Sequence, residues 1–230
     1  MVDGDEGHHA ANVVRVRAGD VVRLIDGDGV EALGRVNEVT RAAVDVGLLE
    51  TRTFSRTDGL ELTVAQALLK GRAFGEVVRK CAELGASEIV PLDTRRSIGR
   101  IPMDATRDRL ERWEAVAAAA VKQSRGVFVP RMSAVHTVDE LVKRVGDAGT
   151  ALVAWEEERS TSLADALSGR RDGEVLLVVG PEGGLTADEV GLLTAAGALA
   201  VSVGRRILRA DWAGAAIAAM ISHQLGGLLP

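Results

Sequence analysis

Residues 178–190, VVGPEGGLTADEV, join the end of an apolar run to the start of a polar helix. The run at 174–179 is short and rich in valine and leucine, which predicts a strand buried on both faces. Thr186, followed three residues later by Glu189, forms a capping box that predicts the helix start. Because glycine has no Cβ and accepts positive φ, the turn at 180–184 either lets a ligand approach the backbone or is only a tight strand–helix connection.

A second connection of the same kind follows near the carboxyl terminus. In VSVGRRILRAD, residues 201–211, an apolar strand ends at Gly204 and a short apolar loop leads into the last helix. Ligands of open α/β sheets bind beyond the carboxyl ends of such strands, so both loops are candidates for one site. Neither loop has the glycine pattern of a dinucleotide or nucleoside triphosphate site.

The composition is that of an ordinary soluble globular protein, with 47% hydrophobic and 27% charged residues. No apolar run approaches the roughly 20 residues that span a bilayer, and acidic residues follow Met1, so we expect a cytoplasmic protein without a membrane segment. Cys81 is the only cysteine and lies in an apolar helical pattern, which predicts a buried core thiol. His8 and His9 are adjacent and lack further ligands, so no metal site is expected.

The net charge of −5 conceals an uneven distribution. Residues 1–62 carry 7 arginines against 12 acidic residues, whereas residues 70–131 carry 13 lysines and arginines against 8 acidic residues. Only charges within about a Debye length act strongly on a ligand, so the second segment can attract phosphate on an acidic protein. Solvated helix faces are the alternative, and charge alone favours them.

The pattern of elements changes after residue 62. Before it, short alternating runs and a hairpin turn at 26–29 are typical of a small β-barrel. After it, strands alternate with long helices, which predicts a mostly parallel sheet covered on both faces. The sequence therefore predicts two domains, residues 1–62 and residues 63–230. Strands of the first domain are predicted at 13–17, 21–25, 30–40 and 43–49.

The expected elements of the second domain follow from apolar periodicity and caps. Strands are predicted at 63–68, 88–91, 151–155, 175–179 and 198–203. Helices are predicted at 72–84, from Asp104 to Ser124, from the Thr137/Glu140 capping box to Val145, from Thr186 onward, and at 211–225. The last helix carries Ile217, Met220, Ile221 and Leu225 on one face, which the same chain or a second copy must cover.

The two loops together resemble a known signature. GPEGGLTADEV at 180–190, followed by VSVGRRILRADWAGAA at 201–216, is similar to the paired signature of the SPOUT-class RNA methyltransferases. The resemblance is specifically to the bacterial family that methylates N3 of a uridine in 16S ribosomal RNA. Further blocks resemble that family in the same order and cover most of the chain: EGHHAANVVRVRAGD at 6–20, LLKGRAFGEVVRKCAELGASEIVPLDTRRS at 68–97 and RWEAVAAAAVKQSRGVFVP at 112–130.

This resemblance implies a PUA-like β-barrel that helps to dock RNA, followed by an α/β SPOUT domain with a mostly parallel sheet. It implies a carboxyl-terminal segment threaded as a trefoil knot, which binds S-adenosylmethionine (SAM). It also implies a homodimer whose substrate is small-subunit ribosomal RNA. The family has an additional strand before the histidine segment that is absent from this sequence, so we expect an incomplete barrel.

The resemblance also assigns cofactor and catalytic residues. Arg209 is the candidate catalytic residue, because a cation stabilises the charge that develops on the uracil oxygens as N3 loses its proton. The alternative is a helix-entry residue paired with Asp211, and the general base stays unassigned. The expected cofactor-binding residues are Ala154, Glu156, Gly180, Pro181, Glu182, Gly183, Val203, Gly204, Ile207, Leu208, Arg209 and Ala213.

RNA contacts are expected on both domains. Because Arg15 and Arg17 alternate with valines, they would face one side of the barrel as phosphate contacts. Lys70, Arg96, Gln123 and Arg125 match polar positions of the family, although the last two are nearly as well explained as a helix terminus bonding its own carbonyls.

Two observations keep other hypotheses open. Trp212 replaces a small polar residue of the family, and the indole either narrows the pocket, stacks on a base or fills a helix interface. Glu182 follows a proline in a turn, where a structural hydrogen bond is as plausible as a catalytic role. The alternatives to the uridine methyltransferase are a SPOUT enzyme acting on another RNA and a non-catalytic RNA-binding relative.

Overall fold

The computed structural model describes residues 1–56, 59–98, 106–170 and 173–226 of the 230. The chain folds as two compact units, Met1–Ser55 and Arg56–Pro230. The division falls before the boundary expected after residue 62, because Arg56 already packs on the second unit. Arg56 lies over the ring of Phe128 and donates a hydrogen bond to the carbonyl of Val129.

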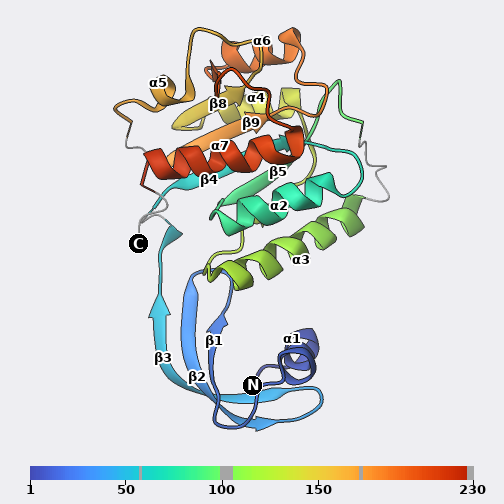
Figure 1. The fold of residues 1–230 in the computed structure, drawn as a ribbon, viewed down its shortest axis with the longest axis vertical. Helices are drawn as coiled ribbons and strands as arrows, with labels where there is room; N and C mark the ends of the chain where they lie inside the picture. The colour runs from blue at the N-terminus through green and yellow to red at the C-terminus, as the bar shows by residue number, and fades with distance from the viewer. Residues whose placement is uncertain (57–58, 99–105, 171–172, 227–230) are drawn as a thin grey trace. The chain divides into compact units, whose positions relative to one another are not determined.

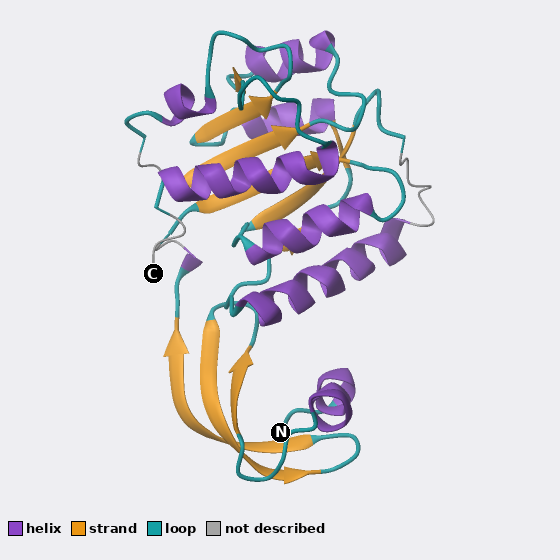
Figure 2. Ribbon diagram, in the orientation of Figure 1, coloured by secondary structure: helices purple, strands orange, loops and turns teal. Residues whose placement is uncertain are grey.

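The first unit contains a three-stranded antiparallel sheet in the order β1-β2-β3 (Figure 2). Its strands are β1 Val21–Ile25, β2 Val30–Val39 and β3 Val44–Thr53. The predicted hairpin turn between β1 and β2 is present, and the Asp26 carboxylate accepts hydrogen bonds from two backbone N–H groups of the turn. These contacts lower the pKa of Asp26.

The strand predicted at 13–17 is not formed. Gly4–His9 is helix α1, Ala10–Val14 continues it as a turn of π-helix, and Arg15 follows with a left-handed φ of 59°. The helix that begins at Gly4 carries through the alternating segment, so local helical hydrogen bonds replace the expected strand pairing. Arg15 and Arg17 are both exposed but do not share a strand face.

The second unit is built on a seven-stranded sheet whose described strand pairs are all parallel. The order is β10-β8-β9-β4-β5-β6, and β7 also pairs with β5. The strands are β4 Glu61–Ala67, β5 Glu88–Asp93, β6 Arg131–Met132, β7 His136–Thr137, β8 Thr150–Ala154, β9 Glu174–Val179 and β10 Leu199–Val201. The prediction of a mostly parallel sheet is confirmed.

Helices cover both faces of this sheet (Figure 1). They are α2 Ala73–Glu83, α3 Thr106–Ser124, α4 Val138–Val145, α5 Leu163–Leu167, α6 Ala187–Ala195 and α7 Ala210–Gln224. Helices α2, α3 and α7 lie on one face, and α4 packs against α6 on the other. Both predicted capping boxes, at Thr137 and Thr186, are formed. Asp104 lies outside the described residues, and α5 was missed because it is only one short turn capped by Ser162.

The core of this unit fixes the central strands. Val64 of β4 and Leu177 of β9 are fully buried, and each such aliphatic side chain contributes about 1.5–3 kcal/mol of burial free energy. On α7, Ile217 and Ile221 are covered by this chain, whereas Met220 stays 44% exposed. The same chain therefore covers most of the apolar face of the last helix.

The loops that follow β8, β9 and β10 meet at one edge of the sheet, because parallel strands end on the same side. The Trp155 backbone N–H donates to the Val201 carbonyl, and the Leu163 N–H donates to the Ser202 carbonyl. The connection from β8 to α5 thus runs along the segment after β10, and α7 packs on β4, β9 and α5. The trefoil knot that the resemblance implies would involve these two segments, the β8–α5 connection and the segment after β10.

Candidate functional site

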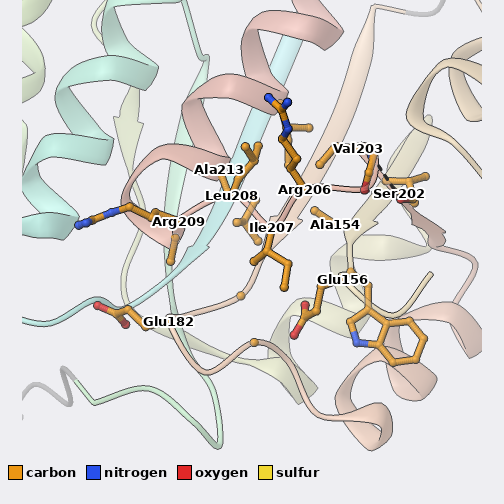
Figure 3. Close-up of a pocket in the computed structure, with 18 of the residues that line it drawn as sticks. Ala154, Glu156, Glu182, Ser202, Val203, Arg206, Ile207, Leu208, Arg209 and Ala213 are labelled. Carbon is orange, nitrogen blue, oxygen red and sulfur yellow. Dashed lines mark hydrogen bonds between the residues drawn. The ribbon is translucent and has the colours of Figure 1, made fainter. Parts of the chain in front are cut away.

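A pocket of about 530 Å³ lies at the carboxyl ends of the parallel strands (Figure 3). Its walls are the loops after β8, β9 and β10, together with the first turns of α7 and one residue of α2. This size and position are those of a site for a nucleoside-sized ligand in an open α/β sheet. The lining residues are Ala73, 154–156, Arg159, 179–182, Gly184, 201–211, Ala213 and Ile217.

The glycine bend after β9 is tightly built. Gly184 has φ +72°, and a Cβ there would lie 2.1 Å from the Glu156 Oε1 atom. A Cβ on Gly180 would lie 3.0 Å from the Leu185 nitrogen. A side chain at Gly184 would have to displace the Glu156 carboxylate and accept a positive φ, and one at Gly180 would crowd the Leu185 backbone, so glycine at both positions lets the bend close on itself.

The bend is also fixed from β4. Gln66 is fully buried, and its Nε2 donates to the carbonyls of Gly180 and Ala67 at 3.2 and 3.3 Å. Its Oε1 has no hydrogen-bond partner among the described residues. That oxygen faces Gly214 of α7, where a Cβ would lie 2.6 Å from it. Gln66 therefore connects the glycine bend, the central sheet and the last helix.

The loop after β10 forms the opposite wall. Gly204 has φ +121°, and its N–H contacts the Ser202 hydroxyl at 3.3 Å. The four residues 204–207 are exposed, and Ile207 is 83% exposed although it lines the pocket. Leu208 and Ala213 are partly buried and add apolar surface.

Arg209 stands at the entry to α7 with an acidic partner. Its Nε and Nη2 atoms donate to the two Asp211 carboxylate oxygens at 3.0 and 2.9 Å, and its side chain is 85% exposed. The hydrogen bond from Arg209 lowers the pKa of Asp211, and the same bond raises the pKa of Arg209. The structure thus contains the helix-entry pair named as the alternative for Arg209, and this arginine also lines the pocket.

Trp212 follows in the first turn of α7 and is 53% exposed. Lys80 Nζ lies 4.9 Å from the centroid of its ring and donates to the Asp211 carbonyl at 3.0 Å. The indole thus lies against Lys80 of the neighbouring helix α2, and it is absent from the pocket lining. Lys80 holds it beside the Arg209–Asp211 pair.

Two predicted RNA-binding residues lie beside the glycine bend. The backbone N–H of Lys70 donates a hydrogen bond to Glu182 Oε1 at 3.3 Å. This contact is the structural hydrogen bond that was expected as one of two possible roles of Glu182. Arg96 Nη1 donates to the Gly183 carbonyl at 2.8 Å, and its side chain packs where a Cβ of Gly183 would point. Gly183 is consequently absent from the pocket lining, unlike the other expected cofactor residues.

The other pair on this unit lies away from the pocket. Gln123 and Arg125 stand at the end of α3, where Arg125 has φ 62° and the Gly126 N–H bonds the Val121 carbonyl. The chain then enters β6, whose first residue pairs with Glu88, the first residue of β5. These side chains are therefore at the amino-terminal edge of the sheet, opposite the pocket.

Three arginines of the pocket were not expected from the sequence: Arg159, Arg205 and Arg206. The sequence signal for the last two was their position directly after Gly204. Arg159 had no such signal, because its position at the pocket depends on the pairing of the β8–α5 connection with the segment after β10. Gln66 was missed for a similar reason, since its partners lie on two distant elements.

Other expectations concern chemistry outside the pocket. Burial raises the pKa of the Cys81 thiol to about 12, and this residue is a core thiol as predicted. In the described ranges, no three His, Cys, Asp or Glu side chains gather as a metal site would require. No helix in those ranges combines the length and the apolar character needed to cross a membrane.

Comparison with known proteins identifies the family. A family model described as RNA methyltransferase domain matches residues 56–222, and one described as RNA methyltransferase PUA domain matches residues 2–49. Ribosomal RNA small subunit methyltransferase E from Mycobacterium bovis is 35% identical over 94% of this chain and 82% of its own length. The Bacillus subtilis protein of the same name is 32% identical over 97% of this chain and 89% of its own length.

A solved structure agrees with these sequence matches. The crystal structure of a ribosomal RNA small subunit methyltransferase E from Neisseria gonorrhoeae, bound to S-adenosyl methionine, has 28% sequence identity and a TM-score of 0.81. The match covers 94% of this chain and 87% of that one. The expected SPOUT domain and PUA-like domain are both borne out by these matches. The chain therefore belongs to the RNA methyltransferase family of the ribosomal RNA small subunit methyltransferases E.

Proposed function

We propose that this protein transfers the methyl group of SAM to N3 of a uridine in small-subunit ribosomal RNA. The observation that carries the proposal is the pocket between the loops after β8, β9 and β10. The relatives of this chain are named ribosomal RNA small subunit methyltransferase E, and the crystal structure of one of them contains bound SAM. The target atom, N3, is the part of the proposal that rests on the resemblance of the loop motifs alone.

The residues of the pocket fit SAM. Gly180 and Gly184 carry no Cβ, so the backbone of the bend can approach a nucleoside closely. Apolar side chains of the loop after β10 suit an adenine ring, and the carboxylates of Glu156 and Glu182 suit hydroxyl and ammonium groups. We assign cofactor binding to Ala154, Glu156, Gly180, Pro181, Glu182, Val203, Gly204, Ile207, Leu208, Arg209 and Ala213, with Gly183 in a supporting role beside Arg96.

When bound, SAM supplies a methyl group on a sulfonium centre, and the protein contributes positioning and exclusion of water. Uracil N3 carries a proton, so its lone pair attacks only as that proton leaves. Negative charge then develops on the flanking carbonyl oxygens, and we assign Arg209 to stabilise it. Because Arg209 is exposed and paired with Asp211, it stays cationic and can exchange that partner for the substrate.

The proton acceptor is left unassigned among the carboxylates that line the pocket, Glu156, Glu182 and Asp211. The bond from Arg209 lowers the pKa of Asp211, which makes this group a weaker base. Arg209→Ala should largely keep cofactor binding, because many other residues line the pocket, and should lose turnover. Arg209→Lys retains the positive charge but cannot form the two parallel hydrogen bonds of a guanidinium group. Equal turnover of Arg209→Ala and the wild type would remove Arg209 from the mechanism.

Two measurements test the function itself. Calorimetry with SAM should detect binding by the purified protein; no binding would favour the non-catalytic RNA-binding relative. Mass spectrometry of ribosomal RNA from cells lacking the gene should detect the loss of N3-methyluridine from the small-subunit RNA. An unchanged level, together with SAM binding, would favour an enzyme that methylates another RNA.

Assembly and location extend the proposal. We assign a homodimer, as the resemblance implies, and the half-exposed apolar side chains Trp212 and Met220 of α7 support a partner surface there. Sedimentation of the purified protein tests it, with a monomer at micromolar concentration as the contrary result. A cytoplasmic location and the RNA contacts of Arg15, Arg17, Lys70, Arg96, Gln123 and Arg125 stay predictions.

A further inference from the structure

We propose that Arg205 and Arg206 bind phosphate groups of the RNA strand that carries the methyl acceptor. This inference rests on the proposed function and adds to it the surface that holds the RNA at the pocket. Both arginines line the pocket, and neither was among the expected RNA contacts.

The first observation is that these two side chains have no acidic partner among the described residues. Both are exposed, whereas two other exposed arginines of this unit are engaged in ion pairs. Arg209 pairs with Asp211, and Arg95 pairs with Asp188. An arginine without a partner can bind an anion without first breaking an ion pair.

The second observation is the geometry of the loop. Gly204, with φ +121°, turns the chain so that the next three residues are exposed. In Figure 3 the Arg206 side chain points away from the carboxylates of Glu156 and Glu182. Arg159, on the same rim, is instead bonded to the carbonyls of Glu156 and Glu158. Among the arginines that line the pocket, those of the loop after β10 are therefore the ones without a partner in the described residues, whereas Arg159 and Arg209 are bonded.

The third observation is chemical. A guanidinium group matches a phosphate with two parallel hydrogen bonds, and two such groups in sequence present a local positive charge on a chain of net charge −5. A uridine entering the pocket brings its own phosphates to the rim. The same anionic chemistry is offered by the carboxylate of the cofactor, so the experiment must separate the two sources.

The experiment measures binding of labelled small-subunit ribosomal RNA to the full-length protein as a function of salt. Each neutralised phosphate of a single strand contributes about 0.7 to the slope of log K against log salt. Arg205→Ala and Arg206→Ala should each lower that slope by about 0.7, and the double variant by about 1.4. At about 0.1 M salt this corresponds to roughly fivefold weaker binding for each arginine.

Lys143→Ala is the matched control, because it removes one exposed positive charge from the end of α4, at the opposite edge of the sheet. Its salt slope should equal that of the wild type. Calorimetry with SAM should give the same affinity for the double variant and the wild type, and thermal unfolding should be unchanged.

Two results would overturn the inference. One is a double variant that binds the RNA with the wild-type slope. The other is a double variant that loses SAM affinity while the RNA slope is kept, which would assign the arginines to the cofactor. If the wild type binds RNA but not SAM, the proposed enzymatic function fails, and the phosphate contacts remain measurable by the salt slope.

Discussion

Gly214 and Gln66 form a contact that should appear as strong coupling between two substitutions. A Cβ on Gly214 would lie 2.6 Å from Gln66 Oε1 and 3.5 Å from a Val77 methyl group. Because Gln66 is fully buried and its Nε2 is bonded to the Gly180 carbonyl, the amide cannot move aside freely. Overpacking of this kind costs about 1–3 kcal/mol, which outweighs the roughly 0.5–1 kcal/mol that alanine gains over glycine inside a helix.

We therefore expect Gly214→Ala to lower the free energy of unfolding by about 1–2 kcal/mol. Gln66→Ala removes the obstructing oxygen, so in that background Gly214→Ala should become neutral or stabilising. The coupling energy of the pair should be about 1–3 kcal/mol. Urea denaturation followed by circular dichroism measures all four variants of the cycle.

Gly191→Ala provides the control for this cycle. Gly191 lies within α6, and a Cβ there would meet no atom within 4 Å. The substitution should stabilise the protein by about 0.5–1 kcal/mol through helix propensity alone. If Gly214→Ala behaves like Gly191→Ala, or if the effects at Gly214 and Gln66 add within about 0.5 kcal/mol, the contact does not constrain α7 as described.

Three further predictions concern the pocket and the core. Gly184→Ala should weaken SAM binding in calorimetry, because its Cβ would displace the Glu156 carboxylate and its positive φ costs about 1 kcal/mol; unchanged affinity would exclude this wall from the cofactor site. Burial raises the pKa of Glu88, but hydrogen bonds from Arg144 and Ser133 lower it by more, so the pKa of this carboxyl is below its usual value in the folded protein. These hydrogen bonds therefore stabilise the folded state fully above about pH 5, and the stabilisation is lost as the pH falls through the folded pKa. Arg144→Met should thus lower the free energy of unfolding, measured by urea denaturation, by about 2 kcal/mol at pH 7 and by less near pH 4. A difference between variant and wild type that does not change with pH would contradict this prediction. Cys81, with its pKa raised to about 12 by burial, should resist iodoacetamide at pH 8 until urea unfolds the protein, as mass spectrometry would detect, and equal labelling of the native protein would contradict this.

The elements that depend on local interactions could be predicted from the sequence. The capping boxes at Thr137 and Thr186 join residues three positions apart, and both are formed. The alternation of apolar strands with helices predicted the parallel sheet, and parallel strands end at one edge, which predicted that the loops at 180–184 and 204–208 would line one site. The same local reasoning failed at 13–17, because helical hydrogen bonds begun at Gly4 extend through Val14.

Motif resemblance added candidate residues without saying where each would lie. Gln123 and Arg125 belong to a block similar to the family's, yet they lie at the edge of the sheet opposite the pocket. Lys70 and Arg96 belong to another such block and lie against the glycine bend. The two pairs differ because Gln123 and Arg125 end α3 just before β6 begins, which places them at the amino-terminal edge of the sheet. Lys70 and Arg96 follow β4 and β5, so they lie at the carboxyl-terminal edge, where the pocket is.

By itself, the sequence determined most helices and strands of the second unit and the two glycine bends, since caps, periodicity and backbone freedom act over a few residues. Only the tertiary structure decided that Gln66 bonds Gly180 beneath the pocket and faces Gly214, and that Arg205 and Arg206 have no acidic partner among the described residues. Such contacts join residues far apart along the chain, and they exist only once β9 is inserted between β8 and β4 and α7 has packed across them.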